Sequence, residues 1–429
     1  MSRGADMLDA IAAAPQVDLK RRPEGRVRAS VAGRIRWANA GWIVLLASLG
    51  LAAIGLYGIS LSGGIDGYAG PLNAARLVQR QVMFIGMGLC CGLIAALVHF
   101  KYVARMSWMI AAVTIAMLVF VLIPFVPDVI VTPRNGARRW INFGLLDFQP
   151  SELAKVSFVI AIAAYLRYRE GHRKLFGLAP PALIAIVPMV LILVEPDLGT
   201  SLLFLPVLLA MLIAAGARLA HLFGTVALGA VFAVLIVVVS LSQAKHDRYP
   251  LLRPHQVNRI LAVIEQHQGD ERHLQSRGFQ GNQAQMLAGS GGMFGHEEHK
   301  SRALIEFSRV PEKQNDMIFA VIVNRFGLVG ALVVAGLYIA WFWGAMVVAA
   351  VATHPFARLL AVGLGTMVLM QATINMGMTI GLLPITGITL PFVSYGGSSL
   401  LIAFVMVGLI VNVALRRPEY LWRPSFEFA

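Results

Sequence analysis

The stretch RNGARRWINFGLLDFQPSELAK, residues 134–155, is a short polar segment between the apolar runs at 107–126 and 151–167. Crossing a hydrocarbon core of roughly 30 Å takes about 20 apolar residues in a helix. The two runs are close to that length, so the segment between them would lie at a membrane surface. Its Trp140 suits that place because tryptophan is enriched at membrane interfaces. The pattern predicts a chain that crosses a membrane by helices.

Composition supports this interpretation over the whole chain. Of the 429 residues, 58% are hydrophobic and 14% are charged, whereas a soluble domain has about 25% charged residues. We predict an all-α polytopic integral membrane protein of about ten transmembrane helices. The predicted spans are 41–61, 82–99, 107–126, 151–167, 178–194, 198–215, 219–241, 317–350, 358–383 and 395–415.

Charge gives these spans a direction. The net charge is +14, and most of the excess lies in the tails and in short loops on one side. The positive-inside rule makes that side cytoplasmic, with both termini on it. Because membrane topology explains the positive charge, no nucleic-acid partner is expected. The domains are then a basic cytoplasmic tail at 1–37, a transmembrane domain at 38–415 and a short cytoplasmic tail at 416–429. A large extracytoplasmic loop, 242–316, separates helices seven and eight. The other outer segments are 62–81, 127–150, 195–197 and 384–394.

Arg138 and Arg139 therefore lie on the side where arginine is scarce. Arginine suits phosphate well because its planar guanidinium donates two parallel hydrogen bonds. A phosphate group at the outer surface would explain the pair. A solvated loop is the simpler alternative, as is a plain interfacial role for Trp140.

The residues Gln149-Pro150-Ser151-Glu152 open the next helix. Proline suits the first turn of a helix, and an acid there complements the helix dipole. Glu152 and Lys155 are three residues apart, so they share a face and can pair. Lys155 would lie about one turn inside the membrane, where a charged side chain is usually functional. A purely structural Glu152–Lys155 pair remains the alternative.

Two further segments carry polar groups at the outer surface. Asp316 stands where the long outer loop becomes a helix, so it is either a helix cap or a partly desolvated general base. The segment 381–401, GLLPITGITLPFVSYGGSSLL, is rich in proline and glycine. Such irregular backbone at membrane depth needs protein or water to satisfy it, so it should line a site. The hairpin EPDLGTS, 195–201, adds two carboxylates, and GSGG, 289–292, is either a turn or a close backbone approach.

These motifs, in this order, resemble the SEDS family, the FtsW, RodA and SpoVE peptidoglycan glycosyltransferases. The resemblance covers about residues 38–415. It rests on GARRWINFG, FQPSELAK, EPDLGTSLLF, GSGGMFG, VPEKQNDMIFAV, INMGMTIGLLPITG and LPFVSYGGSSLL. The last two look closer to the RodA branch, which acts in cell elongation and shape, than to the FtsW branch, which acts in cell division.

The resemblance implies an inverting hexosyltransferase in the cytoplasmic (inner) membrane of a bacterium. Such enzymes polymerise lipid II into glycan strands at the outer face, release polyprenyl diphosphate and work beside a class B penicillin-binding protein. Asp316 would be the catalytic base. A divalent cation, Mg²⁺ or Mn²⁺, would assist at the diphosphate, with ligands that the sequence does not name, and no organic cofactor is expected. The implied substrate-binding residues are Arg138, Arg139, Trp140, Gln149, Ser151, Glu152, Lys155, Ser394, Tyr395, Gly396, Gly397, Ser398 and Ser399.

The sequence also departs from the family pattern. Gln314-Asn315 replaces the usual His-Thr before Asp316, and Asn324 and Arg325 stand where a pair of glutamates is usual. On a continuous helix Arg325 would lie about 13 Å deeper than Asp316, where an arginine needs a partner. A lipid-linked precursor flippase and a catalytically weak scaffold of a cell-wall complex therefore stay as alternatives to the polymerase.

Overall fold

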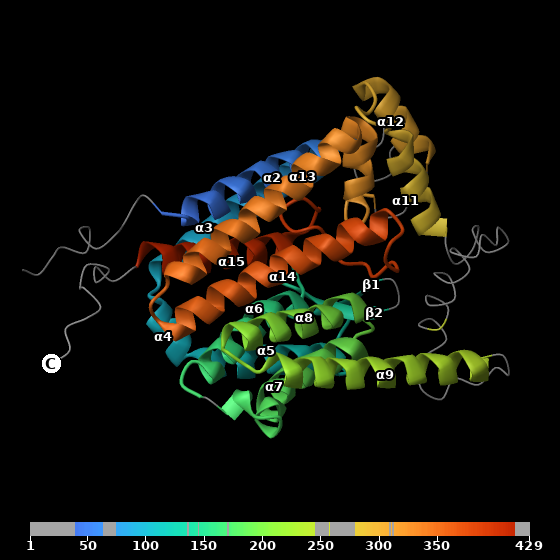
Figure 1. Ribbon diagram of the computed structural model, residues 1–429. Coiled ribbons are helices and arrows are strands. Elements are labelled where there is room, and N and C mark those ends of the chain that lie inside the picture. Colours follow the sequence, from blue (N-terminus) through green and yellow to red (C-terminus); the bar gives the residue numbers. More distant parts are fainter. Residues whose placement is uncertain are drawn as a thin grey trace, which may run out of the picture. The chain divides into compact units, whose positions relative to one another are not determined.

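The computed structural model describes residues 39–62, 74–134, 137–144, 146–169, 171–244, 257, 279–308, 310 and 313–416. The tails at 1–37 and 417–429 and much of the 242–316 loop lie outside these residues. A helix occupies each of the ten predicted spans (Figure 1). They are α2 (Gly41–Ser62), α3 (Ala74–Leu97), α5 (Ser107–Leu122), α6 (Pro150–Leu166), α7 (Ala179–Val194), α8 (Leu198–Ala214), α9 (Leu219–Ala244), α13 (Ile318–Val351), α14 (Pro355–Thr379) and α15 (Gly397–Leu415).

Length and composition make many of these helices membrane spans. Among the described residues, six helical segments are long and apolar enough to cross a membrane, and α5 and α8 are shorter apolar helices. The six segments are Gly41–Ser62, Ala74–Leu97, Phe176–Val194, Ile318–Val351, Pro355–Thr379 and Gly397–Leu415. The prediction of a polytopic helical membrane protein is confirmed.

Helices distant in sequence pack against one another. α15 lies against α3 and α2, α13 packs against α2 and α14, and α14 also contacts α6 and α8. The contact between α3 and α15 is close because glycines meet there: a Cβ added to Gly408 would lie 2.0 Å from the Gly92 carbonyl oxygen. The buried core runs through these helices and includes the large side chains Tyr338, Trp341 and Phe404.

The outer segment between α5 and α6 corrects the all-α prediction. It folds into a three-stranded antiparallel sheet of β1 (Val131–Arg134), β2 (Ala137–Asn142) and β3 (Asp147–Phe148). Val131 and Ile141 are buried with Val121 of α5 in a small cluster of their own. A segment that leaves a helix at the membrane surface still has to pair its backbone groups, and strand pairing does so here.

The predicted span at 317–350, which is long for one crossing, is interrupted in α13 at Gly327. That residue has φ 66° and ψ −159°, which are non-helical values. Beyond it, Leu328 N donates to the Gly292 carbonyl (2.9 Å) and Val329 N to that of Met293 (3.2 Å). The part after the break is long enough to cross the membrane alone, at about 1.5 Å per residue. Residues 318–326 form a separate short arm, so the depth expected for Arg325 from a continuous helix does not hold.

The outer loop crosses α13 at this break. Two short helices, α11 (Phe279–Ser290) and α12 (Glu298–Phe307), flank the crossing segment. A Cβ on Gly291 would lie 2.2 Å from the Val323 carbonyl oxygen, and one on Gly295 would lie 2.2 Å from that of Arg325. The close-approach interpretation of GSGG is therefore confirmed.

Candidate active site

The start of α6 buries three of the predicted residues. Gln149 is the N-cap and Pro150 opens the helix. Ser151, Glu152 and Lys155 are all buried, with Lys155 only 1% exposed. Lys155 Nζ lies 2.8 Å from Glu152 Oε2, so the predicted pair is confirmed.

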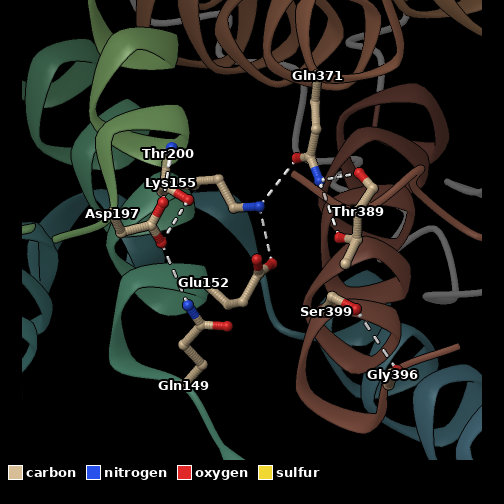
Figure 2. A network of polar contacts seen from close by, with 9 residues as sticks. All are labelled: Gln149, Glu152, Lys155, Asp197, Thr200, Gln371, Thr389, Gly396 and Ser399. Carbon is tan, nitrogen blue, oxygen red and sulfur yellow. Dashed lines mark hydrogen bonds and ion pairs between the residues drawn. The ribbon is translucent and has the colours of Figure 1, made fainter. Parts of the chain in front are cut away.

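Lys155 also reaches across to α14. Its Nζ donates to Gln371 Oε1 at 2.9 Å, and Gln371 Nε2 donates to the Thr389 carbonyl at 2.9 Å. Figure 2 shows Lys155 between Glu152 and Gln371, with Thr389 on the far side of the amide. The lysine is thus tied to the irregular segment at 381–396 through one side chain.

Asp316 is half-buried and precedes Met317, the N-cap of α13. Asn375 of α14 donates to the carbonyl oxygens of Asp316 (2.8 Å) and Ile388 (2.6 Å). A Cβ added to Gly387 would lie 3.4 Å from Asp316 Oδ2. The carboxyl group of Asp316 therefore lies beside the 381–396 segment.

Gln371 and Asn375 join these two places. They are four residues apart on one face of α14, a rise of about 6 Å. One amide binds Lys155 and Thr389, and the other binds Asp316 and Ile388. Neither amide was predicted from the sequence as a site residue. Two polar residues one turn apart in an apolar helix were the available signal.

The serine- and glycine-rich segment at 394–399 is held from both sides. Ser394 Oγ donates to the Asn315 carbonyl (2.7 Å), and Tyr395 N donates to that of Gln314 (2.9 Å). From α3, Gln81 Nε2 donates to the Ser394 carbonyl at 3.1 Å. This confirms that protein groups satisfy the irregular backbone.

The rest of the 394–399 segment leads into α15. Gly396 N donates to Gln81 Oε1 at 3.4 Å, and Gly397 begins the helix. Ser398 is buried, and Ser399 Oγ donates to the Gly396 carbonyl at 3.5 Å.

The structure separates the two arginines of β2. Arg138 donates to the carbonyls of Pro124 and Val126 and lies 3.5 Å from Asp128, so it fixes the end of α5. Arg139 points elsewhere: its Nε donates to the Glu195 carbonyl and its Nη2 to that of Pro196. Neighbouring residues of a strand face opposite sides, which explains the split.

Trp140, the next residue of β2, is half-buried and pairs with Thr132 of β1.

The hairpin at 195–197 connects Arg139 to the start of α6. Asp197 caps α8 by accepting from Thr200 N (3.1 Å) and Thr200 Oγ1 (2.9 Å), and Gln149 Nε2 donates to its Oδ2 at 3.3 Å (Figure 2). Glu195, between α7 and α8, is 1% exposed, and neither of its carboxyl oxygens has a partner among the described residues. Burial, reinforced by Asp197 and opposed by Arg139, raises the pKa of Glu195 to about 8.

Asn324 and Arg325 have partners outside this site. Asn324 is buried and accepts from Ser301 Oγ (2.7 Å) while it donates to Ser290 Oγ (2.8 Å). Arg325 Nε donates to the Tyr57 hydroxyl (3.1 Å), and Nη1 donates to the His296 carbonyl (2.8 Å). The residues in place of the usual glutamates therefore fasten α11 and α12 to α13 and α2.

The described residues offer little to a metal ion. In the ranges given above, no group of three or more His, Cys, Asp and Glu side chains could hold one. The expected divalent cation therefore has no matching ligand set in the described part of the chain, and no step below depends on it.

The family model FTSW_RODA_SPOVE, described as "Cell cycle protein", matches residues 42–419. The chain belongs to this family. Stage V sporulation protein E of Bacillus subtilis (strain 168) is 32% identical over 338 residues, or 78% of this chain and 86% of that protein. The "Probable peptidoglycan glycosyltransferase FtsW" of Thioalkalivibrio sulfidiphilus (strain HL-EbGR7) is 33% identical over 378 residues, or 86% of this chain and 87% of that protein.

Solved structures agree on the fold. One, described as "Structural coordination of polymerization and crosslinking by a peptidoglycan synthase complex", is 26% identical with TM-score 0.68 and covers 87% of this chain and 96% of its own. RodA of Thermus thermophilus, at 23% identity and TM-score 0.59, covers 87% and 95% and shows the fold alone. This FtsW/RodA/SpoVE family member is a multi-pass protein of the bacterial cytoplasmic membrane.

Proposed function

We propose that this FtsW/RodA/SpoVE family member is a peptidoglycan glycosyltransferase that polymerises lipid II at the outer face of the membrane and releases polyprenyl diphosphate. The proposal rests on one observation above all. Gln371 and Asn375 of α14 hold the buried cation Lys155 and the backbone of Asp316 in one polar layer. Transfer from a diphosphate-linked sugar needs a cation for the leaving group and a base for the acceptor hydroxyl, and Lys155 and Asp316 are the candidates for these two roles.

The chemistry divides between these two groups. The 4-hydroxyl of the acceptor sugar attacks the anomeric carbon of the donor, and Asp316 accepts its proton as general base. The bond between that carbon and the diphosphate oxygen breaks, and Arg139 and Lys155 stabilise the charge that the leaving diphosphate gains. Inversion at the anomeric carbon needs this base and no covalent nucleophile.

Arg139, rather than Arg138, takes the diphosphate role in this proposal. Arg138 is held by the carbonyls at the end of α5. The bonds of Arg139 to Glu195 and Pro196 use Nε and Nη2, and we assign Nη1 to the substrate. Gln149, Ser151, Glu152 and the segment 394–399 shape the surroundings of these charges.

The proposal also covers the side of the membrane that the site faces, the partner protein and the role in elongation. The positive charge of the short loops on the other side supports an outward-facing site, and a class B penicillin-binding protein is the proposed partner. A similar solved structure is described as a peptidoglycan synthase complex. We retain a role in elongation as a prediction, although FtsW and SpoVE are the names of the curated relatives reported above.

Polymerisation of purified lipid II tests the proposal. The native protein and Asp316→Asn are compared with and without the class B partner, with Asp128→Asn as a control for loss of an outer carboxylate. We expect polymer from the native protein and the control and none from Asp316→Asn at equal folding. Equal polymer from all three would remove Asp316 from the mechanism. No polymer from any of them would favour the flippase or scaffold alternatives.

A further inference from the structure

The Glu195 carboxyl group is a buried ionisable group that the mechanism above does not use. It is 1% exposed, and no described residue donates to or pairs with either oxygen. An ionised carboxylate in that position would be costly, because a buried charge needs a partner. The geometry therefore favours the neutral acid.

Arg139 makes this arrangement unusual. Its guanidinium donates to the backbone carbonyl of Glu195 and to that of Pro196. It bonds the backbone of Glu195 through Nε, yet forms no ion pair with the carboxyl group of that residue among the described contacts. While the Glu195 carboxyl group is neutral, it does not offset the positive charge of Arg139.

The helices around Glu195 bring few other charges. Helices α5, α7 and α8 contain no charged residue within their bounds. On α6, Glu152 and Lys155 pair with each other. Asp197 accepts from Gln149 and Thr200 as the cap of α8. Asp197 and Arg139 are the groups whose charges act on Glu195, and the resulting pKa of about 8 agrees with the geometric argument.

We propose that Glu195 is a positioning residue that stays neutral so that Arg139 keeps its full positive charge for the diphosphate of the lipid substrate. This inference rests on the proposed function and deepens it. When Glu195 ionises, its carboxylate compensates Arg139 and the site loses affinity for the diphosphate. Affinity for lipid II then falls at alkaline pH with no change in the base, Asp316.

The test compares KM for lipid II at pH 7 and pH 9 in the native protein, Glu195→Gln and Glu297→Gln. Glu297 is an exposed glutamate outside the site and controls for loss of a carboxylate. The neutral fraction of a group with pKa about 8 falls about tenfold over this range, so native KM should rise by up to about tenfold. Glu297→Gln should behave like the native protein, and Glu195→Gln should lose this rise. Any ionisation of lipid II affects KM equally in all three proteins, so it does not contribute to the difference between them.

Binding of polyprenyl diphosphate to the same proteins in lipid nanodiscs, at the same two pH values, separates the two hypotheses. If the native protein makes no polymer, the proposed function fails, and binding still tests Glu195. A native affinity that weakens at pH 9, with a Glu195→Gln affinity that does not, supports the inference. If Glu195→Gln folds poorly, Arg139→Gln replaces it, because without the guanidinium the pH effect should vanish. Equal pH dependence in the native protein and the variant overturns the inference.

Discussion

Replacing Lys155 by methionine should destabilise the protein and stop polymerisation. The change leaves the Glu152 carboxylate buried without the ammonium group that lies 2.8 Å away, and Gln371 loses its donor. Breaking one partner of a buried pair costs about 3–5 kcal/mol of unfolding free energy. Glu152→Gln combined with Lys155→Met removes both charges, so most of that loss should be recovered.

The double variant separates the structural role from the catalytic one. Unfolding of each variant is followed in detergent, and polymer formed from lipid II is measured per amount of folded protein. We expect the double variant to be stable and inactive, because it lacks the cation that we propose for the leaving diphosphate. If the double variant is stable and polymerises lipid II at the native rate, then Lys155 is only a structural partner of Glu152 and our mechanism is wrong about it.

Three further predictions concern the fold and the pH dependence of stability. Gly327→Ala should lower the melting temperature, because the added Cβ would lie 2.4 Å from the Met293 carbonyl oxygen. The control Gly336→Ala has open space around the added Cβ and should raise stability by up to about 1 kcal/mol. Equal melting temperatures for the two variants would contradict this. Asn324→Leu should make the α11–α12 region more sensitive to protease, since each buried polar group left unpaired costs about 1–3 kcal/mol. Burial raises the pKa of Glu195 from 4.5 to about 8, so its contribution to native stability is full below pH about 4.5 and is lost as pH rises toward 8. Glu195→Gln should therefore gain stability over the native protein across that window, by at most about 5 kcal/mol, and a constant difference in melting temperature between pH 5 and pH 8.5 would refute this.

The helices could be predicted from the sequence because the length of each apolar run gives the approximate length of a membrane-spanning helix. The sheet at 131–148 could not be predicted with the same ease. In that segment Arg138 and Arg139 were treated as a pair in the sequence. Their side chains point to opposite sides because successive side chains of a strand alternate between its two faces. The break at Gly327 was also hidden, since an isolated glycine is common in a membrane helix. Its positive φ depends on contact with residues 292–293, which no local pattern reveals.

The candidate site was predictable where a residue carries its own signal. A lysine inside an apolar run and an acid at the start of a helix stand out in a sequence, and the structure brings Lys155 and Asp316 to the same helix, α14. Gln371 and Asn375, which make that connection, are ordinary amides until their partners are known. Glu195 was visible as an acid in a hairpin, but its burial and the direction of Arg139 follow only from tertiary packing.

The interruption of α13 has a consequence for how the chain enters the membrane. The amide groups of Leu328 and Val329 find their acceptors in Gly292 and Met293 rather than within the helix. These two residues open the part of α13 that can cross the membrane, so their amides have no acceptor within the helix and use the loop instead. Residues 292–293, although synthesised earlier, have to dock before these two amides are paired. Assembly of the C-terminal half is therefore a cooperative event, and a nascent chain halted after Val351 should contain the whole helix yet still depend on the loop to hold it.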